Sequence, residues 1–364
     1  MWPASINGGR GRCGTHKDLD GISHGLLRSP IKSSAGYETD RFRWMRHNFA
    51  RLLYLFRHAH PGWRNPARSI QALHYHNFTE SGARSSLDVP VPFVKTQLQR
   101  LSERFCFVNA KAALDQIFQE QDLRFARPGL ILTVDDGLQS LERILPVLEC
   151  LDIPVLLFVP VGLCLDDSLE SRRSWCLRYY CETNAFGDGT ADSGFFDRVM
   201  SAGLSELSEI RRQLVEFWQN PDPVSSQPLL SQKSLESLAR HPLVTLGSHS
   251  MSHAPLGMLP ASWCQWEIET SVRALSNIGG DPELFAYPYG IGRALSDAAE
   301  KFLARAQVRY AFTTATLSTT SRSRPLRLGR TGLEACTDGP YLWGTAMGVY
   351  EWSYRIKTAV RRTA

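Results

Sequence analysis

The sequence predicts an α/β protein whose parallel sheet is curled into a barrel and interrupted by a helical insertion. Short runs of consecutive apolar residues alternate with segments that repeat apolar residues at helical spacing. This alternation is typical of parallel strands joined by right-handed helical crossovers. Five to seven such units favour a barrel over an open sheet, and a chain of 364 residues is long enough for a barrel with insertions.

The strands and helices are expected in regular order from residue 70 onward. The first strand is predicted at 70–76. The later strands are predicted from continuous apolar runs, which suit strands buried on both faces, at 130–134, 155–159, 243–246, 284–287 and 308–312. Helices are predicted from apolar residues at helical spacing, at Val94, Leu98 and Leu101; Leu141, Ile144, Leu145 and Leu148; Ile268, Val272 and Leu275; and Ala299, Phe302 and Leu303.

Positive charge is concentrated at the start of the chain. Residues 1–72 contain 12 Lys and Arg against 4 Asp and Glu, whereas the rest has 29 against 32. We therefore predict a basic N-terminal arm over 1–69 and a near-neutral body that does not bind nucleic acid. Apolar residues at helical spacing among arginines in 44–58 indicate an amphipathic helix, which either lies on an anionic membrane or packs on the barrel.

The barrel domain is expected over 70–335, and the C-terminal 336–364 as a helical tail. Polar clusters break the rhythm at about 161–235, which predicts an insertion of helices and loops that is either a lid or simple decoration. No run of about 18 uncharged apolar residues is present, so a spanning helix is not expected.

The cysteines and the N-terminus bear on the compartment. Eight cysteines without a CxxC pair, among them Cys106 and Cys150 within apolar runs, are expected to be buried free thiols in a reducing compartment. The first 40 residues have no apolar core of a signal peptide. We predict a cytoplasmic protein, membrane-associated if the arm binds lipid, with a periplasmic location left open.

Two adjacent carboxylates follow a predicted buried strand. Asp135 and Asp136 stand before Gly137, which permits a tight turn into the next helix. Neighbouring side chains diverge at a strand end, so one carboxylate can bind a metal while the other faces a reacting water. The alternative is an N-cap of the following helix.

Two further segments follow later strands. His249 and His253 are spaced i and i+4, which would place both on one face of a helical turn and suits zinc; the alternative is a surface histidine pair. In 285–290, an aromatic–Pro–aromatic–Gly turn carries Tyr289, whose backbone amide can face a developing oxyanion unless the segment is merely a turn. Two histidines and one carboxylate make a three-ligand zinc site with an open position, and the spare carboxylate can serve as general base.

The motifs DDG, HSxxH and FAYPYG, in this order, resemble those of the polysaccharide deacetylases of carbohydrate esterase family four, the NodB-like domain. LHYHNF, LLFVPVG and YAFTT add to the resemblance, which spans about 70–330. It implies a distorted (β/α) barrel and metal-dependent removal of acyl groups from amino sugars. It implies that Asp136, His249 and His253 hold the metal, that Asp135 is the catalytic base, and that the Tyr289 amide donates to the oxyanion.

The chain departs from the family pattern at three places. Many members have Phe where this chain has Val134, which we interpret as a packing change only. Many members have an Arg where this chain has Ala286, and that Arg orients the catalytic Asp; Arg330 is our candidate for the same task. Many members also use a late histidine as general acid, but no histidine follows His253. A related subgroup, the biofilm-polysaccharide N-deacetylases, takes its acid from an early Tyr-His strand, which His76 matches. We therefore expect His76 to be the general acid, with His74 as competitor.

These expectations combine into a metal-dependent N-deacetylase that acts on an amino-sugar polysaccharide or oligosaccharide. The cofactor is expected to be a divalent metal, with Zn²⁺ as first choice, although cobalt and nickel accept the same ligands. Alternatives are an O-deacetylase, a deformylase of a lipid-linked sugar, and a catalytically silent carbohydrate-binding relative. A membrane-bound structural partner of a polysaccharide synthesis complex is a further alternative that depends on the basic arm.

Overall fold

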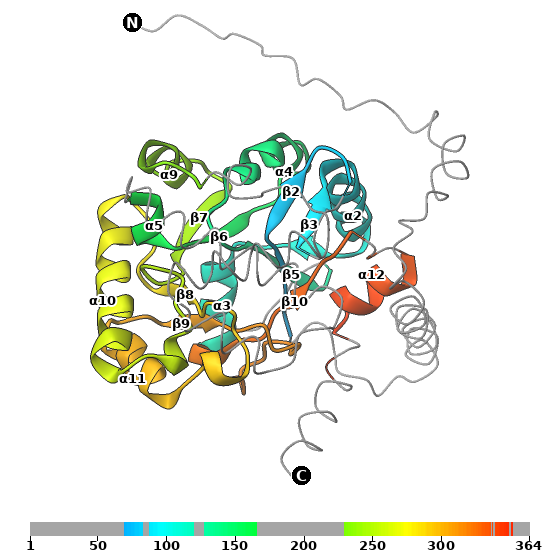
Figure 1. Cartoon of the computed structure of the whole chain (residues 1–364). Helices are drawn as coiled ribbons and strands as arrows, with labels where there is room; N and C mark the ends of the chain where they lie inside the picture. Colours follow the sequence, from blue (N-terminus) through cyan, green and yellow to red (C-terminus); the bar gives the residue numbers. More distant parts are fainter. Residues whose placement is uncertain are drawn as a thin grey trace, which may run out of the picture. The chain divides into compact units, whose positions relative to one another are not determined.

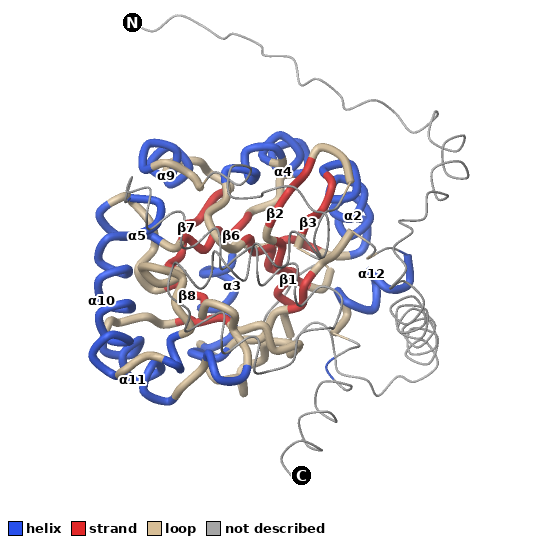
Figure 2. The backbone as a smooth tube through the Cα atoms, viewed as in Figure 1, coloured by secondary structure: helices blue, strands red, loops and turns tan. Residues whose placement is uncertain are grey.

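A curled parallel sheet forms the centre of the fold, with helices around it (Figures 1 and 2). The computed structural model describes residues 69–82, 87–119, 127–165, 229–335, 337, 339–348 and 351. Within these ranges the strand order is β10-β1-β5-β6-β7-β8-β9, with β4 paired to β5 at the side, and every pairing is parallel. The structure confirms the predicted fold class.

The predicted strands and helices are present, with shifted ends. The strands of the main sheet are β1 (Gln71–Tyr75), β4 (Cys106–Phe107), β5 (Gly129–Val134), β6 (Val155–Val159), β7 (Val244–Ser248), β8 (Leu284–Ala286), β9 (Tyr310–Phe312) and β10 (Thr331–Gly332). The α-helices are α2 (Val91–Arg104), α3 (Ala110–Phe118), α4 (Leu145–Leu151), α5 (Val161–Leu165), α9 (Gln232–Ala239), α10 (Ala261–Asn277), α11 (Asp297–Arg305) and α12 (Gly339–Ala346). The 3₁₀ helices are η2 (Gln139–Arg143), η3 (Leu256–Met258), η4 (Gly292–Ala294) and η5 (Pro325–Arg327).

The core lies between the sheet and its covering helices. Every residue of β5 and β6 is buried, as their continuous apolar runs predict. The helix α2 begins with a proline in its first turn and buries Val94, Leu98 and Leu101 against the sheet. Serine side chains cap α9 and α11 by accepting a backbone N–H of the first turn. Local sequence signals and burial therefore agree along the barrel.

Several short elements were not predicted. β2 (Asn77–Thr79) and β3 (Asp88–Pro90) form a separate two-stranded sheet, and β4 and β10 have only two residues each. The predicted helix at 141–148 is divided, because η2 ends at Arg143 and α4 starts at Leu145 with Pro146 in its first turn. Proline cannot donate a backbone hydrogen bond to the preceding turn, so a new helix begins there.

The distortion of the barrel is located between β9 and β10. These two strands end the sheet path and do not pair with each other. The chain that leads to β10 runs along β9 instead: Leu328 bridges Phe312 in parallel, and Thr331 then pairs with Leu73 on β1. One segment therefore joins the two edges, and Arg330 lies within it.

Other predictions are changed by the structure or lie outside the described residues. Two helices, α5 and α9, lie at the ends of the predicted insertion. Its middle part, 166–228, and residues 1–68 of the basic arm lie outside the described ranges, so the boundaries of the insertion and the arm stay predictions. The burial prediction is wrong for Cys150, which is exposed on α4, and Cys106 is half-buried, whereas Cys164 and Cys264 are buried. Among the described helices, none is both long and apolar enough to span a membrane.

Candidate active site and metal centre

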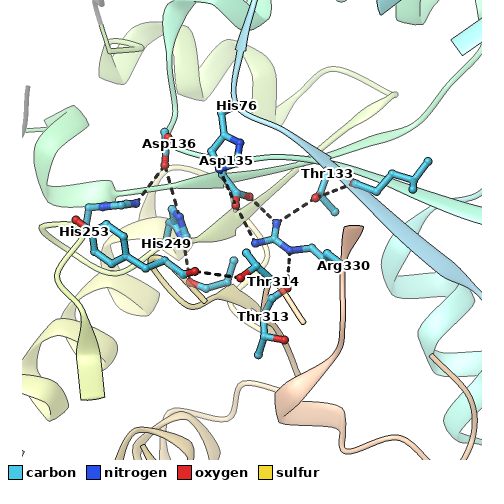
Figure 3. A network of polar contacts seen from close by, with 12 residues as sticks. His76, Thr133, Asp135, Asp136, His249, His253, Thr313, Thr314 and Arg330 are labelled. Carbon is cyan, nitrogen blue, oxygen red and sulfur yellow. Dashed lines mark hydrogen bonds and ion pairs between the residues drawn. The ribbon is translucent and has the colours of Figure 1, made fainter. Parts of the chain in front are cut away.

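Strand register brings the predicted site residues to one edge of the sheet. Tyr75 pairs with Val134, so the residues that follow these strands, His76 and Asp135, are level with each other. On the other side, His249 directly follows β7 and donates its backbone N–H to Val159 on β6 (2.8 Å). The carboxyl ends of parallel strands are where ligands bind in α/β folds. Figure 3 shows these side chains facing one another.

Asp135 is held by a buried arginine. The Arg330 guanidinium donates from Nη1 to Oδ1 of Asp135 (2.6 Å) and from Nη2 to Oδ2 (2.8 Å), and Arg330 is fully buried (Figure 3). It also donates to Thr133 Oγ1 (3.0 Å) and to the carbonyl of Thr313 (3.2 Å). The expected contact between Arg330 and Asp135 is confirmed. The resemblance implies an arginine where this chain has Ala286, and the arginine that contacts Asp135 here comes from the segment that joins β9 and β10.

The pairing keeps Asp135 ionised. Burial is the largest single effect and raises the pKa of its carboxyl, but the charge and hydrogen bonds of Arg330 together with the charges of His249 and His76 outweigh it. The net pKa therefore lies well below the ordinary range of an aspartate. Asp135 is oriented by two hydrogen bonds and carries its charge throughout the physiological pH range.

Asp136 points away from Asp135 and toward the two histidines. Its Oδ1 lies 3.2 Å from Nε2 of His253 and 3.6 Å from Nε2 of His249 (Figure 3). The three side chains are buried, and their ligand atoms lie within 4.8 Å of one another. The expected divergence of the two carboxylates is confirmed by their different partners.

This donor set fits a divalent ion such as zinc. Zinc–ligand distances of 2.0–2.2 Å place the ligands of a tetrahedral ion about 3.3–3.6 Å apart. The separations of 3.2 and 3.6 Å are close to that spacing. Asp136, His249 and His253 would hold the ion, and three protein ligands would leave one position open, as in catalytic zinc sites.

His249 has the protonation that a metal ligand needs. Its Nδ1 donates a hydrogen bond to the carbonyl of Ala286 (2.8 Å), which leaves Nε2 toward Asp136. Burial lowers the pKa of His249 to about 4 against the opposing charges of Asp135 and Asp136. The imidazole is therefore neutral near pH 7, in the form that binds metals.

The histidine pair is brought together in a different way from the prediction. We expected His249 and His253 on a helical turn, and this is wrong: no helix is present at 249–253, and Ser250 (φ 65°) and His253 (φ 58°) have left-handed backbone. The loop nevertheless places the two rings 4.8 Å apart. The i, i+4 spacing correctly indicated that the two histidines lie together, whereas the left-handed residues that bend the loop had no local sequence signal.

Backbone strain is concentrated at the site. Asp136 (φ 74°) and Tyr289 (φ 61°) are also left-handed, so four of the six described non-glycine residues with positive φ belong to the three predicted motifs. Such conformations are unfavourable for residues with a Cβ and persist where surrounding contacts hold them. The Tyr289 ring packs edge-on against His253 at 4.8 Å, and Thr314 Oγ1 donates to the Tyr289 carbonyl (3.1 Å). The predicted oxyanion turn thus directly adjoins the metal ligands.

The structure distinguishes the two early histidines. His76 Nε2 lies 3.9 Å from Oδ2 of Asp135, and the His76 side chain is 17% exposed. The ring centroid of His74 lies 5.1 Å from that of His76, and among the described residues the buried Nδ1 of His74 has no hydrogen-bond partner. Burial, and after it the charge of Arg330, hold the pKa of His74 well below the ordinary value. His76 is therefore the better placed of the two to give up a proton.

Two partners of Arg330 were missed by sequence reasoning. Thr133 is a polar residue inside the buried apolar strand β5, and Thr313 follows β9 and is also buried. A buried hydroxyl or carbonyl needs a hydrogen-bond partner, so a threonine within an apolar run is a usable signal. The identity of its partner could not be read from the sequence, because Arg330 lies almost 200 residues away along the chain.

The sequence matches a family model over residues 187–311, which include His249, His253 and the turn of Tyr289. That model is described as polysaccharide deacetylase. The chain carries a polysaccharide deacetylase domain. The predicted family is confirmed by this match, and with it a hydrolase of the polysaccharide deacetylase class. Asp135 and Asp136 lie outside the matched range of this deacetylase domain.

Solved structures agree with this fold. The Streptococcus pyogenes deacetylase PplD in complex with acetate has 16% identity and a TM-score of 0.53, over 76% of this chain and 98% of that one. IcaB from Ammonifex degensii has 18% identity and a TM-score of 0.51, over 77% and 97%. A de-N-acetylase from Aggregatibacter actinomycetemcomitans has 12% identity and a TM-score of 0.53, over 76% and 99%. No curated protein matches the deacetylase chain in sequence.

Proposed function

We propose that this chain is a metal-dependent N-deacetylase of an amino-sugar polysaccharide or oligosaccharide. The observation that carries the proposal is the division of two adjacent carboxylates: Asp135 pairs with Arg330, and Asp136 faces His249 and His253. This arrangement offers one ionised carboxylate for proton transfer beside a three-ligand metal site. A deacetylase bound to acetate and a de-N-acetylase among the similar structures support removal of acetyl groups from nitrogen.

A bound divalent ion, with Zn²⁺ as our first choice, would polarise the amide carbonyl and lower the pKa of water at the open position. Asp135 takes a proton from the attacking water as its oxygen bonds to the carbonyl carbon. The backbone N–H of Tyr289 stabilises the negative charge on the former carbonyl oxygen. His76 then donates a proton to the sugar nitrogen as the carbon–nitrogen bond breaks. The products are acetate and the free amino sugar.

Arg330 acts on this reaction through Asp135. Its two hydrogen bonds fix both carboxylate oxygens, and Oδ2 is the oxygen that lies 3.9 Å from His76. The low pKa of Asp135 keeps the carboxylate available for a proton but makes it a weak base. We infer that Asp135 holds the proton only briefly and that the nearby His76 completes the transfer to the amine.

Two alternatives share these residues. An O-deacetylase or a deformylase of a lipid-linked sugar would use the same metal ligands and base. Assays with O-acetylated, N-acetylated and N-formylated sugars distinguish these activities from the proposed one. A catalytically silent carbohydrate-binding relative is disfavoured, because the three metal ligands and the oriented carboxylate are all in place. The cytoplasmic location stays a proposal from the sequence, and the proposed lipid contact of the arm falls on residues outside the described ranges.

The test combines metal content with acetate release from a short chitooligosaccharide. Wild-type protein should hold one divalent ion per chain and release acetate, and His249→Ala should lose both. His241→Ala is the matched control, since His241 lies before β7 at the opposite edge of the sheet and pairs with Glu149 (3.0 Å). Metal without acetate release would favour another acyl group, and wild-type protein without metal would contradict the proposal.

A further inference from the structure

A buried carboxylate from another element holds the loop between the two histidines. Glu267 lies on α10 and is only 3% exposed. Its Oε2 accepts the backbone N–H groups of Met251 (2.9 Å) and Ser252 (3.0 Å), and its Oε1 accepts the Ser252 hydroxyl (2.5 Å). One side chain therefore satisfies three donors of the loop. Sequence reasoning missed Glu267, because its helix shows only an ordinary apolar pattern.

The opposite side of the loop is held by α5. Val161 donates its N–H to the carbonyl of Ser250 (3.0 Å), and Leu163 donates its N–H to the carbonyl of Met251 (3.2 Å). A Cβ on Gly162 would lie 2.8 Å from the Met251 carbonyl oxygen, so this close approach requires glycine. The loop is thus fixed by backbone donors from α5 and by the Glu267 carboxylate from α10.

These contacts matter because the loop has no regular structure of its own. Ser250 and His253 are both in the left-handed region, which external contacts must stabilise. His253 Nε2 must reach Asp136, from which it lies 3.2 Å away, for the two to share an ion. A small change of the backbone at Ser252 would move the His253 imidazole by a comparable distance.

We propose that Glu267 is a positioning residue of the metal site: by accepting three hydrogen bonds it fixes the loop so that His253 faces Asp136. The inference rests on the proposed function, because it assigns Glu267 a role toward the same ion. Substitution of a residue that orients a metal ligand typically weakens metal affinity by about 10–100-fold. Glu267 contacts no reacting atom and acts only through the loop.

The conservative variant separates positioning from charge. In Glu267→Gln, the amide oxygen can accept both backbone N–H groups, and the amide nitrogen can donate to the Ser252 hydroxyl, which then accepts. This variant should keep the loop and the metal. Glu267→Ala removes all three acceptors, and Glu267→Asp keeps the charge but is one methylene shorter. Glu269→Ala is the matched control, since Glu269 accepts from Gln265 on the same helix (2.9 Å).

Two measurements test the inference on the full chain. Amide hydrogen exchange of metal-free protein reports whether Met251 and Ser252 are protected, and competition with a chelator gives the Zn²⁺ affinity. Glu267→Ala and Glu267→Asp should exchange faster at these two amides and bind Zn²⁺ about 10–100-fold more weakly. Glu267→Gln and Glu269→Ala should resemble the wild type in both measurements. The visible spectrum of bound Co²⁺ should change in Glu267→Ala and Glu267→Asp only.

The outcomes separate the two claims. Wild-type Zn²⁺ affinity in Glu267→Ala and Glu267→Asp would overturn the inference, as would equal losses in Glu267→Gln and Glu267→Ala. If Glu267→Ala fails to fold, Glu267→Asp still decides, because it retains the buried charge. If wild-type protein binds no Zn²⁺, the proposed function fails, and hydrogen exchange alone then shows whether Glu267 holds the loop.

Discussion

Replacing Arg330 by methionine should strongly destabilise the fold. Methionine keeps an unbranched apolar stem but is shorter, and it removes the donors to Asp135, Thr133 and the Thr313 carbonyl. Arg330 is fully buried and Asp135 is 2% exposed, so solvent cannot replace the lost partner. Removing one partner of a buried ion pair costs about 3–5 kcal/mol in the free energy of unfolding. For a domain of this size that corresponds to a Tm lower by roughly 6–20 °C.

The pH dependence tests the physical cause. In the wild type, the pKa of Asp135 is lower in the folded state than in the unfolded state. The Asp135–Arg330 pair therefore contributes fully to the free energy of unfolding above the unfolded-state pKa of about 3.9, and this contribution is constant from pH 5 to 8. In Arg330→Met, burial without Arg330 raises the folded pKa of Asp135 above its unfolded value. The variant therefore loses stability as the pH rises and Asp135 must ionise. Its deficit relative to the wild type should be smaller at pH 5 than at pH 8.

Urea unfolding of metal-free protein at pH 5 and pH 8 measures this difference. Arg327→Met is the control, because Arg327 is half-buried and pairs with Glu300 at the surface, where ion pairs contribute about 0–1 kcal/mol. Asp135→Asn combined with Arg330→Met removes the unpaired charge and should be more stable than Arg330→Met alone. A deficit in Arg330→Met that does not change with pH, or no deficit at all, would refute the reasoning.

Substitutions at the early histidines and at Gly290 have expected outcomes of their own. His76→Gln should lower kcat by about 10²–10⁴-fold at unchanged metal content, because it removes the proposed general acid, and His74→Gln should lower kcat less. Steady-state kinetics measures both, and a larger loss of kcat in His74→Gln would reverse the two roles. Gly290→Ala should destabilise the fold by about 1–2 kcal/mol and lower kcat, because the backbone of Gly290 is left-handed (φ 59°), which is unfavourable for a residue with a Cβ. An alanine Cβ at this position would also lie only 2.7 Å from the Thr314 nitrogen. Thermal unfolding of this variant at the wild-type temperature would argue against a tight oxyanion turn.

The strands and the placement of the site could be predicted because both depend on short-range patterns. Continuous apolar runs identified β5 and β6, and the parallel arrangement then implied that residues after each strand meet at one edge. This was sufficient to bring Asp135, Asp136 and His249 together. The two-residue strands β4 and β10 could not be predicted, because they depend on pairing with distant neighbours rather than on their own sequence.

The two side chains that hold the site from distant segments differ in how far they could be predicted. The contact of Arg330 with Asp135 was expected from the family resemblance, and the structure adds that its segment joins β9 to β10. Glu267 reaches the histidine loop from a separate helix and was found only in the structure. The left-handed backbone at Ser250 and His253 is imposed by such contacts and not by residue type. Sequence patterns therefore predicted the side chains that the structure brings together at the candidate site, whereas the backbone conformation and the contact of Glu267 depend on distant parts of the chain.

The most direct test compares acetate release by Zn²⁺-loaded wild-type protein and Asp135→Asn on the same chitooligosaccharide. The account predicts that both proteins hold one ion per chain, because Asp135 pairs with Arg330, whereas Asp136 is the carboxylate that faces His249 and His253. It predicts that only the wild type releases acetate at an appreciable rate. Acetate release by Asp135→Asn at the wild-type rate would contradict the central claim that the two carboxylates divide proton transfer and metal binding between them.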